Sequence, residues 1–399
     1  MSPTHVERWK RVMVPNYNPP PLLLSHGKGT SLWDAAGRQY LDFFAGVAVC
    51  STGHAHPRVA EAVSRQAQTL LHTSNLYAHE NVLRLAEELT SRTGYEKAFF
   101  CNSGAEANEF ALKLVRRHAN RKGVTDGVIL SFERAFHGRT LATVTLTGTP
   151  KYQKDFAPLP SGFVHLPYND LTALRTAFDN LPVIGVFLEF VQGEGGVNEA
   201  TFEFAEEVRH LCTERGALLV ADEVQTGVGR TGKFLSQEHY GVRADVVTLA
   251  KGLGSGLPIG AGLTTSPLAE LLQPGDHGTT FGGNPVATAA ALATLQVLDH
   301  ELLTERAGHL GEHFQQELRT HLAPWVKDVR GKGLLVGVEF TVLKAADVKK
   351  EAERLGLIVG TAGDNVLRLA PPLIVTREEC ERAAALLEKA CANLAAGPT

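Results

Sequence analysis

Two polar residues, each directly after an apolar stretch, are the first candidates for chemistry. Asp222 follows residues 217–221, and Lys251 follows residues 245–250. If both stretches are buried strands of an open α/β sheet, these side chains lie at the carboxyl ends of strands, where such sheets bind ligands. A lysine is costly to bury unpaired, and a desolvated lysine is nucleophilic enough to form a Schiff base. Taken singly, Asp222 could also cap a turn, and Lys251 could also extend into solvent.

A third segment has the features of a phosphate site. Ser103, Gly104 and Ala105 form a turn of small residues between the apolar residues 97–101 and a predicted helix over residues 105–120. Backbone N–H groups at the start of a helix bind phosphate without a lysine, because the helix dipole supports them. Such a turn is weak evidence when it stands alone.

An aromatic residue and two arginines complete the set. Phe136 offers a flat face that can stack on a ring, and Arg139 and Arg368 could each bind a carboxylate through two hydrogen bonds. Taken singly, either arginine is more typical of a solvated surface. Together, a phosphate site, a stacking ring, an acid and a Schiff-base lysine are what pyridoxal phosphate requires. The arginines then indicate amino-acid substrates.

Two other motifs favour no site of their own. Residues 227–233 have the Gly-x-x-x-x-Gly-Lys spacing of a nucleotide loop, but Phe234 follows where Mg²⁺ binding requires serine or threonine, so we reject an NTPase. No Gly-x-Gly-x-x-Gly after the first predicted strand supports a dinucleotide site. His54 and His56 have His-x-His spacing, but without a third ligand in view we interpret them as turn residues and expect no metal.

The elements that must position these residues alternate along the chain. Short apolar runs, typical of strands buried on both faces, alternate with segments of helical periodicity. Strands are expected over residues 97–101, 127–131, 183–189, 217–221 and 245–250, and in the C-terminal part over 333–341, 357–360 and 365–369. Helices are expected over residues 57–71, 80–91, 105–120, 202–215, 286–302, 305–321 and 377–394.

This pattern predicts an α/β fold in which a mostly parallel central sheet is covered by helices on both sides. We expect a large cofactor-binding domain over residues 53–285 and a small α+β domain over residues 286–399. Residues 1–52 contain only short strand-like fragments, at 22–24 and 39–43, too few for a domain. They are expected to pack on the small domain or on a partner subunit.

Composition excludes several classes of protein. The 399 residues are 44% hydrophobic and 21% charged, which is typical of a globular chain long enough to bury a large core. A net charge of −4 without a basic block gives no footprint for nucleic acid. The five scattered cysteines favour a reducing cytoplasm. The first ten residues lack the apolar run of a signal peptide, and residues 278–298 are too interrupted to span a membrane.

At these residues the sequence closely resembles the class III (ω-amino acid) aminotransferases of pyridoxal phosphate fold type I. The resemblance extends from about residue 9 to residue 387. Seven motifs in the same order carry it: GHAHP (53–57), NSGAEAN (102–108), FHGRT (136–140), DEVQTGVGRTG (222–232), KG (251–252), HGTTFGGNP (277–285) and RLAPP (368–372).

The resemblance implies a cofactor role for each matched residue. Lys251 would hold pyridoxal phosphate covalently and later move the proton between substrate and cofactor, while Asp222 would hold the pyridine nitrogen. Gln225 would contact the ring's phenolic oxygen, and Phe136 would stack on the ring. The phosphate would bind Gly104 and Ala105, and Thr280 of the neighbouring subunit, which implies a homodimer with shared sites. Further cofactor contacts are expected from Ser103, His137, Glu223 and Val224.

The resemblance also implies how two substrates share one pocket. Arg139 would bind the α-carboxylate of the donor, leaving its distal amine at the cofactor. Arg368 would bind the α-carboxylate of 2-oxoglutarate or glutamate, and Glu194 would pair with it while the donor is bound. Such a switch lets one pocket accept a distal amine and then an α-amino acid. Thr279 and Tyr77 are also expected near the substrate.

Three departures from the family pattern bear on these roles. Phe190 stands where the family usually has proline, which concerns the backbone leading to Glu194. Ser255 interrupts the glycine triplet after the lysine, and His79 lies near a loop expected to line the substrate site.

The expected function is a cytoplasmic, dimeric aminotransferase that moves the δ-amino group of N2-acetyl-L-ornithine to 2-oxoglutarate in arginine biosynthesis. The products would be N-acetylglutamate 5-semialdehyde and L-glutamate. Ornithine, succinyl-diaminopimelate, a carrier-linked lysine and 4-aminobutyrate remain alternative donors. An aminomutase suits the paired arginines less well. A non-catalytic pyridoxal phosphate-binding protein is the alternative of a different class.

Overall fold

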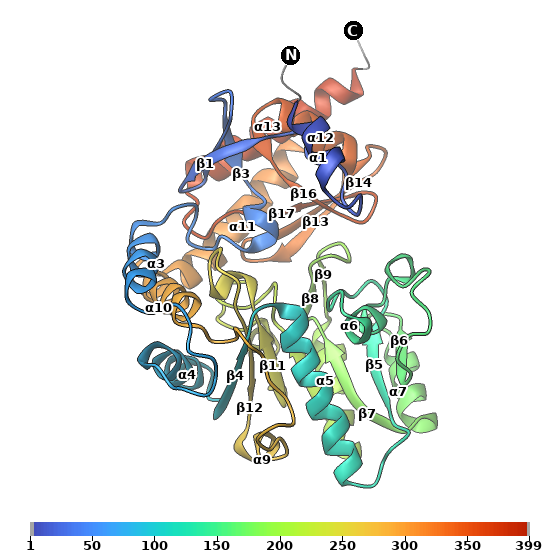
Figure 1. The fold of residues 1–399 in the computed structure, drawn as a ribbon. Coiled ribbons are helices and arrows are strands. Elements are labelled where there is room, and N and C mark those ends of the chain that lie inside the picture. Colours follow the sequence, from blue (N-terminus) through green and yellow to red (C-terminus); the bar gives the residue numbers. More distant parts are fainter. Residues whose placement is uncertain (1–3, 397–399) are drawn as a thin grey trace.

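A seven-stranded sheet forms the middle layer of the lower, larger part of the computed structural model, which describes residues 4–396 (Figure 1). β12 runs antiparallel to β11 and β4, and the other neighbours are parallel. The predicted α/β fold with a mostly parallel sheet is confirmed. The strand order is β4 (Lys97–Cys101), β12 (Gly260–Thr264), β11 (Val246–Leu249), β10 (Leu218–Asp222), β7 (Val183–Leu188), β5 (Val128–Phe132) and β6 (Phe163–Leu166).

Helices cover both faces of this sheet because successive strand residues point to opposite sides. Val220 belongs to the core on the face of α5, whereas its neighbour Leu219 belongs to the core on the opposite face. Both cores are apolar, so the strands read as continuous apolar runs. The covering helices are α5 (Gly104–Arg121) and α9 (Ser266–Ala269) on one face, and α4 (Glu80–Thr93), α7 (Leu171–Asn180), α8 (Phe202–Arg215) and α10 (Pro285–His300) on the other.

Local sequence signals set the ends of several helices. Thr201 caps the start of α8 by accepting a hydrogen bond from Phe204 N, and Gly216 ends the helix with φ 69°. The remaining elements of this unit are α3 (Pro57–Thr69), α6 (Leu141–Leu146), β8 (Val191–Gln192), β9 (Asn198–Glu199) and the 3-10 turns η1 (Pro150–Tyr152), η2 (Ser236–Tyr240) and η3 (Lys251–Leu253).

A second unit contains a four-stranded antiparallel sheet packed against helices. The predicted strand over residues 357–360 divides into two short strands that belong to different sheets, since β15 (Leu357–Ile358) pairs with a strand of the N-terminal segment. The sheet order is β13 (Val326–Lys332), β14 (Leu335–Phe340), β17 (Val366–Leu369) and β16 (Gly360–Ala362), and the helices are α11 (Leu303–His321), α12 (Ala345–Arg354) and α13 (Arg377–Ala395).

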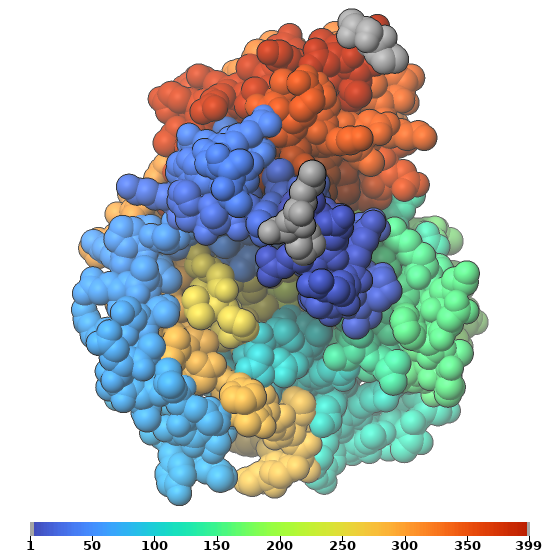
Figure 2. Space-filling model, turned by 45° about the horizontal axis from the view of Figure 1, so that its top comes forward, coloured from blue at the N-terminus to red at the C-terminus, as the bar shows by residue number. Residues whose placement is uncertain are grey.

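The N-terminal segment joins this second unit. β3 pairs in parallel with β15, so the N-terminal segment and the C-terminal unit contribute strands to one sheet. Figure 2 shows the N-terminal segment in blue lying against the orange and red C-terminal residues. Division into domains after residues 52 and 285 stays a prediction, and α10 packs against α3 and α4 across the second of these points. The N-terminal elements are α1 (His5–Val12), β1 (Leu24–Lys28), β2 (Ser31–Asp34), β3 (Gln39–Asp42) and α2 (Ala45–Ala48).

Among the helices described between residues 4 and 396, none is long and apolar enough to cross a bilayer.

Candidate active site

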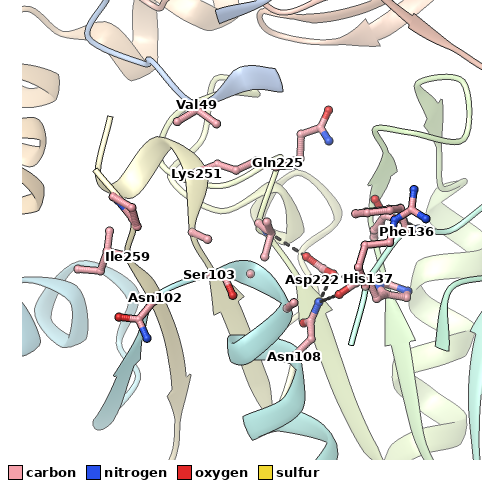
Figure 3. Close-up of a pocket in the computed structure, with 18 of the residues that line it drawn as sticks. Val49, Asn102, Ser103, Asn108, Phe136, His137, Asp222, Gln225, Lys251 and Ile259 are labelled. Atoms are coloured by element: carbon pink, nitrogen blue, oxygen red, sulfur yellow. Dashed lines mark hydrogen bonds and ion pairs between the residues drawn. The ribbon is translucent and has the colours of Figure 1, made fainter. Parts of the chain in front are cut away.

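A cavity of about 420 Å³ opens at the carboxyl ends of the central strands (Figure 3). The chain leaves β4, β10 and β11 at the same sheet edge, as expected for ligand sites in open α/β sheets. Most of the predicted site residues are therefore brought together. Those that line the cavity are Ser103, Gly104, Ala105, Phe136, His137, Arg139, Asp222, Val224, Gln225 and Lys251.

Asp222 is held at the floor of the cavity by three donors. Its Oδ2 accepts hydrogen bonds from Asn108 Nδ2 at 2.7 Å and from His137 Nδ1 at 2.7 Å. Its Oδ1 accepts from the backbone N–H of Val224 at 3.0 Å. The carboxylate is only 4% exposed, so these bonds fix its orientation and stabilise its negative charge.

His137 links Asp222 to the loop that carries Phe136. Burial favours the neutral ring, but the hydrogen bond and charge of Asp222 outweigh burial, so the pKa of His137 is raised. The neighbouring Gly138 has φ 142°, and a Cβ atom there would lie 2.4 Å from Thr143 Oγ1 and 2.8 Å from Ala105 Cβ. Only glycine lets this loop approach the start of α5 so closely.

The start of α5 supplies free backbone donors. Ser103 caps the helix, because its Oγ accepts from Glu106 N at 3.2 Å and its carbonyl accepts from Ala107 N at 3.1 Å. The N–H groups of Gly104 and Ala105 precede these and have no acceptor within the helix. Both residues line the cavity, where an anion would complete the hydrogen bonding of their N–H groups.

Lys251 lies on the wall beside this floor. It begins η3, one residue after β11 ends at Leu249, and adopts φ 39°, an uncommon conformation for a residue with a side chain. Burial lowers the pKa of its amine and outweighs the opposing charge of Glu194, and the positive charge of Arg368 adds to the effect of burial. A neutral, nucleophilic amine is thereby favoured.

Arg368 and Glu194 form an ion pair next to Gln225. Arg368, on β17, is 3% exposed, and its Nη1 donates to Glu194 Oε1 at 2.5 Å and to Gln225 Oε1 at 3.0 Å. Its Nε is buried and has no partner among the residues that the structure describes. Glu194 lines a second cavity, of about 760 Å³, rather than the first. Space into which its side chain can turn is therefore available.

Arg139 stands at the mouth of the first cavity. Its guanidinium lies 3.8 Å from the ring centre of Tyr152 and 5.5 Å from that of Phe136. Stacking on two rings orients an otherwise exposed arginine and leaves its donors free for a carboxylate.

Besides Arg368 and Glu194, four predicted site residues do not line the first cavity. Glu223 points into the core, where it accepts from Ser236 Oγ at 2.8 Å and Gln237 N at 2.9 Å, so within this chain it stabilises a loop. Thr279 reaches the cavity only indirectly, through a 3.0 Å hydrogen bond from Asn102 Nδ2. Thr280 and Tyr77 line a separate small recess.

Among the residues at or beside the cavity that were not predicted, three contact the predicted site residues directly. Asn108 holds Asp222, and its own Oδ1 accepts from Thr248 Oγ1 at 2.8 Å. Glu189 lines the cavity and accepts from Phe136 N at 3.0 Å, and burial raises its pKa to about 7. Tyr152 supports Arg139. An asparagine on the sheet-facing side of a helix was the available signal for Asn108, since a buried amide needs partners.

The departures from the family pattern also have structural roles. Phe190 is fully buried and packs on the ring of Tyr240, with ring centres 5.1 Å apart. Ser255 Oγ accepts from Thr52 N at 2.9 Å, which ties the loop after Lys251 to the N-terminal segment. His79 caps α4 and contacts the carbonyl of Gly283 at 2.8 Å.

These surroundings fit pyridoxal phosphate. The free N–H groups of Gly104 and Ala105 suit its phosphate, and the Phe136 side chain lines the cavity where a ring could stack. The fixed carboxylate of Asp222 suits a protonated ring nitrogen, and Lys251 suits its aldehyde.

Comparison with known proteins gives the same result. The family model described as aminotransferase class-III matches residues 12–391. An acetylornithine aminotransferase of Caldanaerobacter subterraneus is 46% identical over 95% of this chain and 97% of its own. One from Mycolicibacterium smegmatis is 49% identical over 94% of each chain.

Solved structures agree over nearly the whole chain. The ornithine aminotransferase of Toxoplasma gondii superposes with a TM-score of 0.94 at 35% identity, covering 98% of this chain and 95% of its own. The acetylornithine aminotransferase of Elizabethkingia anophelis gives 0.87 at 32% identity, covering 97% and 98%. Together with the geometry of the cavity, these matches show that the chain belongs to the class-III aminotransferases and is a pyridoxal phosphate-dependent enzyme.

Proposed function

We propose that the enzyme transfers the δ-amino group of N2-acetyl-L-ornithine to 2-oxoglutarate, giving N-acetylglutamate 5-semialdehyde and L-glutamate for arginine biosynthesis. The observation that carries this proposal is the buried Arg368, paired with the Glu194 carboxylate beside Lys251. A buried arginine that can be covered or exposed suits a pocket that must accept two differently oriented substrates. The names of the relatives at 46% and 49% identity support acetylornithine as donor.

Arg139 and Arg368 would then divide the carboxylate binding. Arg139, oriented by Tyr152, would hold the α-carboxylate of the donor and so direct its distal amine toward Lys251. When 2-oxoglutarate enters, Glu194 would turn toward the second cavity and expose Arg368 to the α-carboxylate. Each substrate is thus oriented by a different arginine.

Bound pyridoxal phosphate supplies an aldehyde that accepts the substrate amine and a ring that withdraws electrons. Lys251 Nζ, with its lowered pKa, would take the proton from the amine-bearing carbon of the substrate and deliver it to the cofactor. Asp222 would keep a proton on the ring nitrogen, because Asn108 and His137 hold its carboxylate in place.

Thr280 supports a homodimer with shared sites. It lies outside the cavity of its own chain, on a loop next to exposed apolar side chains. Such a cluster is typical of an interface that another subunit covers. Its members are Leu71 (61% exposed), Leu76 (85%), Tyr77 (72%) and Phe281 (60%). The five free cysteines support a reducing, cytoplasmic location.

The test is the absorbance spectrum of the cofactor-loaded enzyme before and after addition of one amine at a time. Conversion by acetylornithine at the lowest concentration supports the proposal. Faster conversion by ornithine would replace it with the second candidate, which the structural match to the Toxoplasma gondii ornithine aminotransferase favours. Lack of conversion by any ω-amine would refute both donors.

A further inference from the structure

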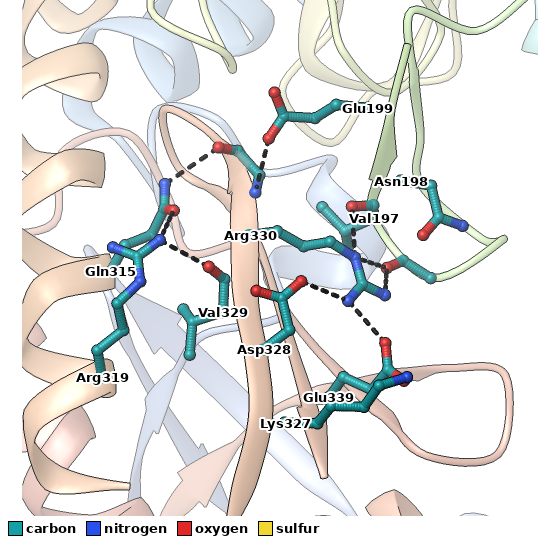
Figure 4. A network of polar contacts seen from close by, with 12 residues as sticks. Val197, Asn198, Glu199, Gln315, Arg319, Lys327, Asp328, Val329, Arg330 and Glu339 are labelled. Carbon is teal, nitrogen blue, oxygen red and sulfur yellow. Dashed lines mark hydrogen bonds and ion pairs between the residues drawn. The ribbon is translucent and has the colours of Figure 1, made fainter. Parts of the chain in front are cut away.

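The hairpin that carries Glu194 rests on the small antiparallel sheet. This hairpin, residues 191–199, consists of β8, β9 and the turn between them. Arg330 of β13 donates to its turn from two nitrogens: Nε lies 3.1 Å from Gly196 O and 3.2 Å from Val197 O, and Nη2 lies 2.7 Å from Gly196 O (Figure 4). Three hydrogen bonds from one guanidinium fix the backbone two residues beyond Glu194.

The guanidinium is itself held on its other side. Arg330 Nη1 donates to Asp328 at 3.0 Å and to Glu339 at 2.8 Å. Gly331 N donates to Glu199 Oε1 at 3.0 Å, and Lys332 forms an ion pair with Glu199 at 2.9 Å. The hairpin is therefore held both at its turn and at its second strand by one short stretch of β13.

The register of the sheet places Arg330 in the same cross-strand row as Arg368. Arg330 pairs with Gly337 on β14, and Gly337 pairs with Arg368 on β17. A Cβ atom at Gly337 would lie 2.8 Å from Val197 Cβ and 3.2 Å from Gly196 O, so the turn packs directly on this glycine. The hairpin thus lies across one row of three residues, with its turn at Arg330 and the Glu194 side chain at Arg368.

We propose that Arg330 is a positioning residue that sets how strongly Glu194 covers Arg368, and so determines which carboxylate substrate the pocket accepts. This inference rests on the proposed function of the Glu194–Arg368 pair. With the turn fixed, Glu194 reaches Arg368 without first ordering its backbone, and the covered state is favoured. A loosened turn would leave Arg368 exposed more often. The exposed Arg368 would then bind the carboxylate of the donor in place of Arg139 and hold the donor in an unproductive orientation.

The two half-reactions should therefore respond differently to Arg330→Gln. For the half-reaction with the amine donor, we expect the ratio of the first-order rate constant to the apparent Kd to fall roughly tenfold or more. This is the usual effect of losing hydrogen bonds from a charged group. The value for glutamate should stay within about twofold of the parent enzyme, because that half-reaction needs Arg368 uncovered. Single-turnover stopped-flow absorbance measures each half separately, and Arg330→Lys should restore part of the donor rate.

Lys327→Gln is the matched control. Lys327 is a basic residue of the same strand that pairs with Glu339 at 2.7 Å and, like Arg330, lines the second cavity, but within the described residues its side chain makes no hydrogen bond or ion pair with the hairpin. It should leave both half-reactions and the hairpin unchanged. Hydrogen exchange of the peptide covering residues 191–199, followed by mass spectrometry, should accelerate in Arg330→Gln and not in Lys327→Gln. This readout does not depend on turnover.

A double variant tests whether Arg330 acts through Glu194. If it does, Arg330→Gln in a Glu194→Gln background should cause little further loss in the donor half-reaction. Additive losses, equal losses in both half-reactions, or unchanged hairpin exchange would overturn the inference. If acetylornithine does not convert the parent enzyme, its proposed role as donor fails instead. The same comparison is then made with the ω-amine that does convert it, or with hairpin exchange alone.

Discussion

His137 Nδ1 lies 2.7 Å from Asp222 Oδ2, and the His137 side chain is fully enclosed. The histidine cannot reach solvent to find another acceptor, so it and Asn108 hold the carboxylate toward the cavity. The orientation of the acid thus depends on residues from three separate segments: Asn108 of α5, His137 in the loop before α6, and Val224, two residues beyond the strand that ends at Asp222.

Removal of this support should weaken catalysis without removing the acid. We expect His137→Phe to lower kcat by roughly 10- to 100-fold, since one hydrogen bond to a buried charge is lost. Asp222→Ala should cost more, because the ring nitrogen then loses its partner. Steady-state kinetics with saturating cofactor measure both variants. A His137→Phe enzyme with parental kcat would show that Asn108 and Val224 alone suffice.

Lys251→Ala should abolish turnover. The side chain supplies both the covalent anchor and the proton-transferring amine, and general base catalysis alone is worth roughly 10²- to 10⁴-fold. The visible absorbance of the lysine-bound cofactor should disappear, although the phosphate site at α5 still binds cofactor noncovalently. Equilibrium dialysis with pyridoxal phosphate checks that residual binding. Normal activity in this variant would refute the assignment of Lys251.

The two arginines should separate the half-reactions. Arg139→Ala is expected to impair the acylated-ornithine half by roughly tenfold or more, and Arg368→Ala the 2-oxoglutarate half by a similar factor, because each loses a charged contact to one carboxylate. Tyr152→Phe, which retains the ring under Arg139, is the control for the first variant. Equal losses in both halves for both arginine variants would contradict this division.

Sequence patterns were sufficient wherever a site residue follows its own strand. Asp222 and Lys251 lie directly after buried apolar runs, and the small residues after β4 begin a helix, so position along the chain determines position at the sheet edge. β12 was not predicted, because its sequence GAGLT has two glycines, which are rare in strand interiors. Its antiparallel direction is set by tertiary pairing.

Contacts between segments distant in the chain could not be predicted from the sequence. Glu189 binds the backbone of Phe136, and Arg330 binds the hairpin turn more than 130 residues away. Both contacts depend on how separate parts of the chain pack together. The residues next to a single arginine or glutamate in the sequence do not indicate which distant residue it will bind. Glu223, adjacent to Asp222 in its motif, shows the converse: successive residues turn to opposite sides, and this one is buried in the core.

Mixed dimers should test whether Thr280 serves the neighbouring site. A dimer of one Lys251→Ala chain and one Thr280→Ala chain contains one complete site only if Thr280 acts across the interface. Differently tagged chains, coexpressed and purified by both tags, should then bind cofactor at that site as tightly as the parent enzyme. The Thr280→Ala homodimer should bind roughly tenfold more weakly, since a hydroxyl contact to a charged phosphate is lost. Equal weakening in the mixed dimer would place Thr280 in its own subunit's site.

His54 should make stability depend on pH in the alkaline range. Its Nε2 lies 2.7 Å from Asp42 Oδ2, and the hydrogen bond to Asp42, followed by that to Cys50, raises its pKa from 6.5 to about 9. Asp42 also accepts from Phe44 N and Ala45 N, so the pair holds the strained backbone that leads to Val49 at the cavity.

Because the folded state binds this proton more tightly, the stabilisation is fully present below pH 6.5 and is lost as the pH rises through about 9. His54→Gln should therefore lower the free energy of unfolding at pH 6 by about 1 kcal/mol, after allowance for solvent screening at this half-buried site. The difference from the parent should shrink by pH 10. Urea unfolding at both pH values measures it, and a difference that stays constant with pH would mean that the His54 contact does not depend on its charge.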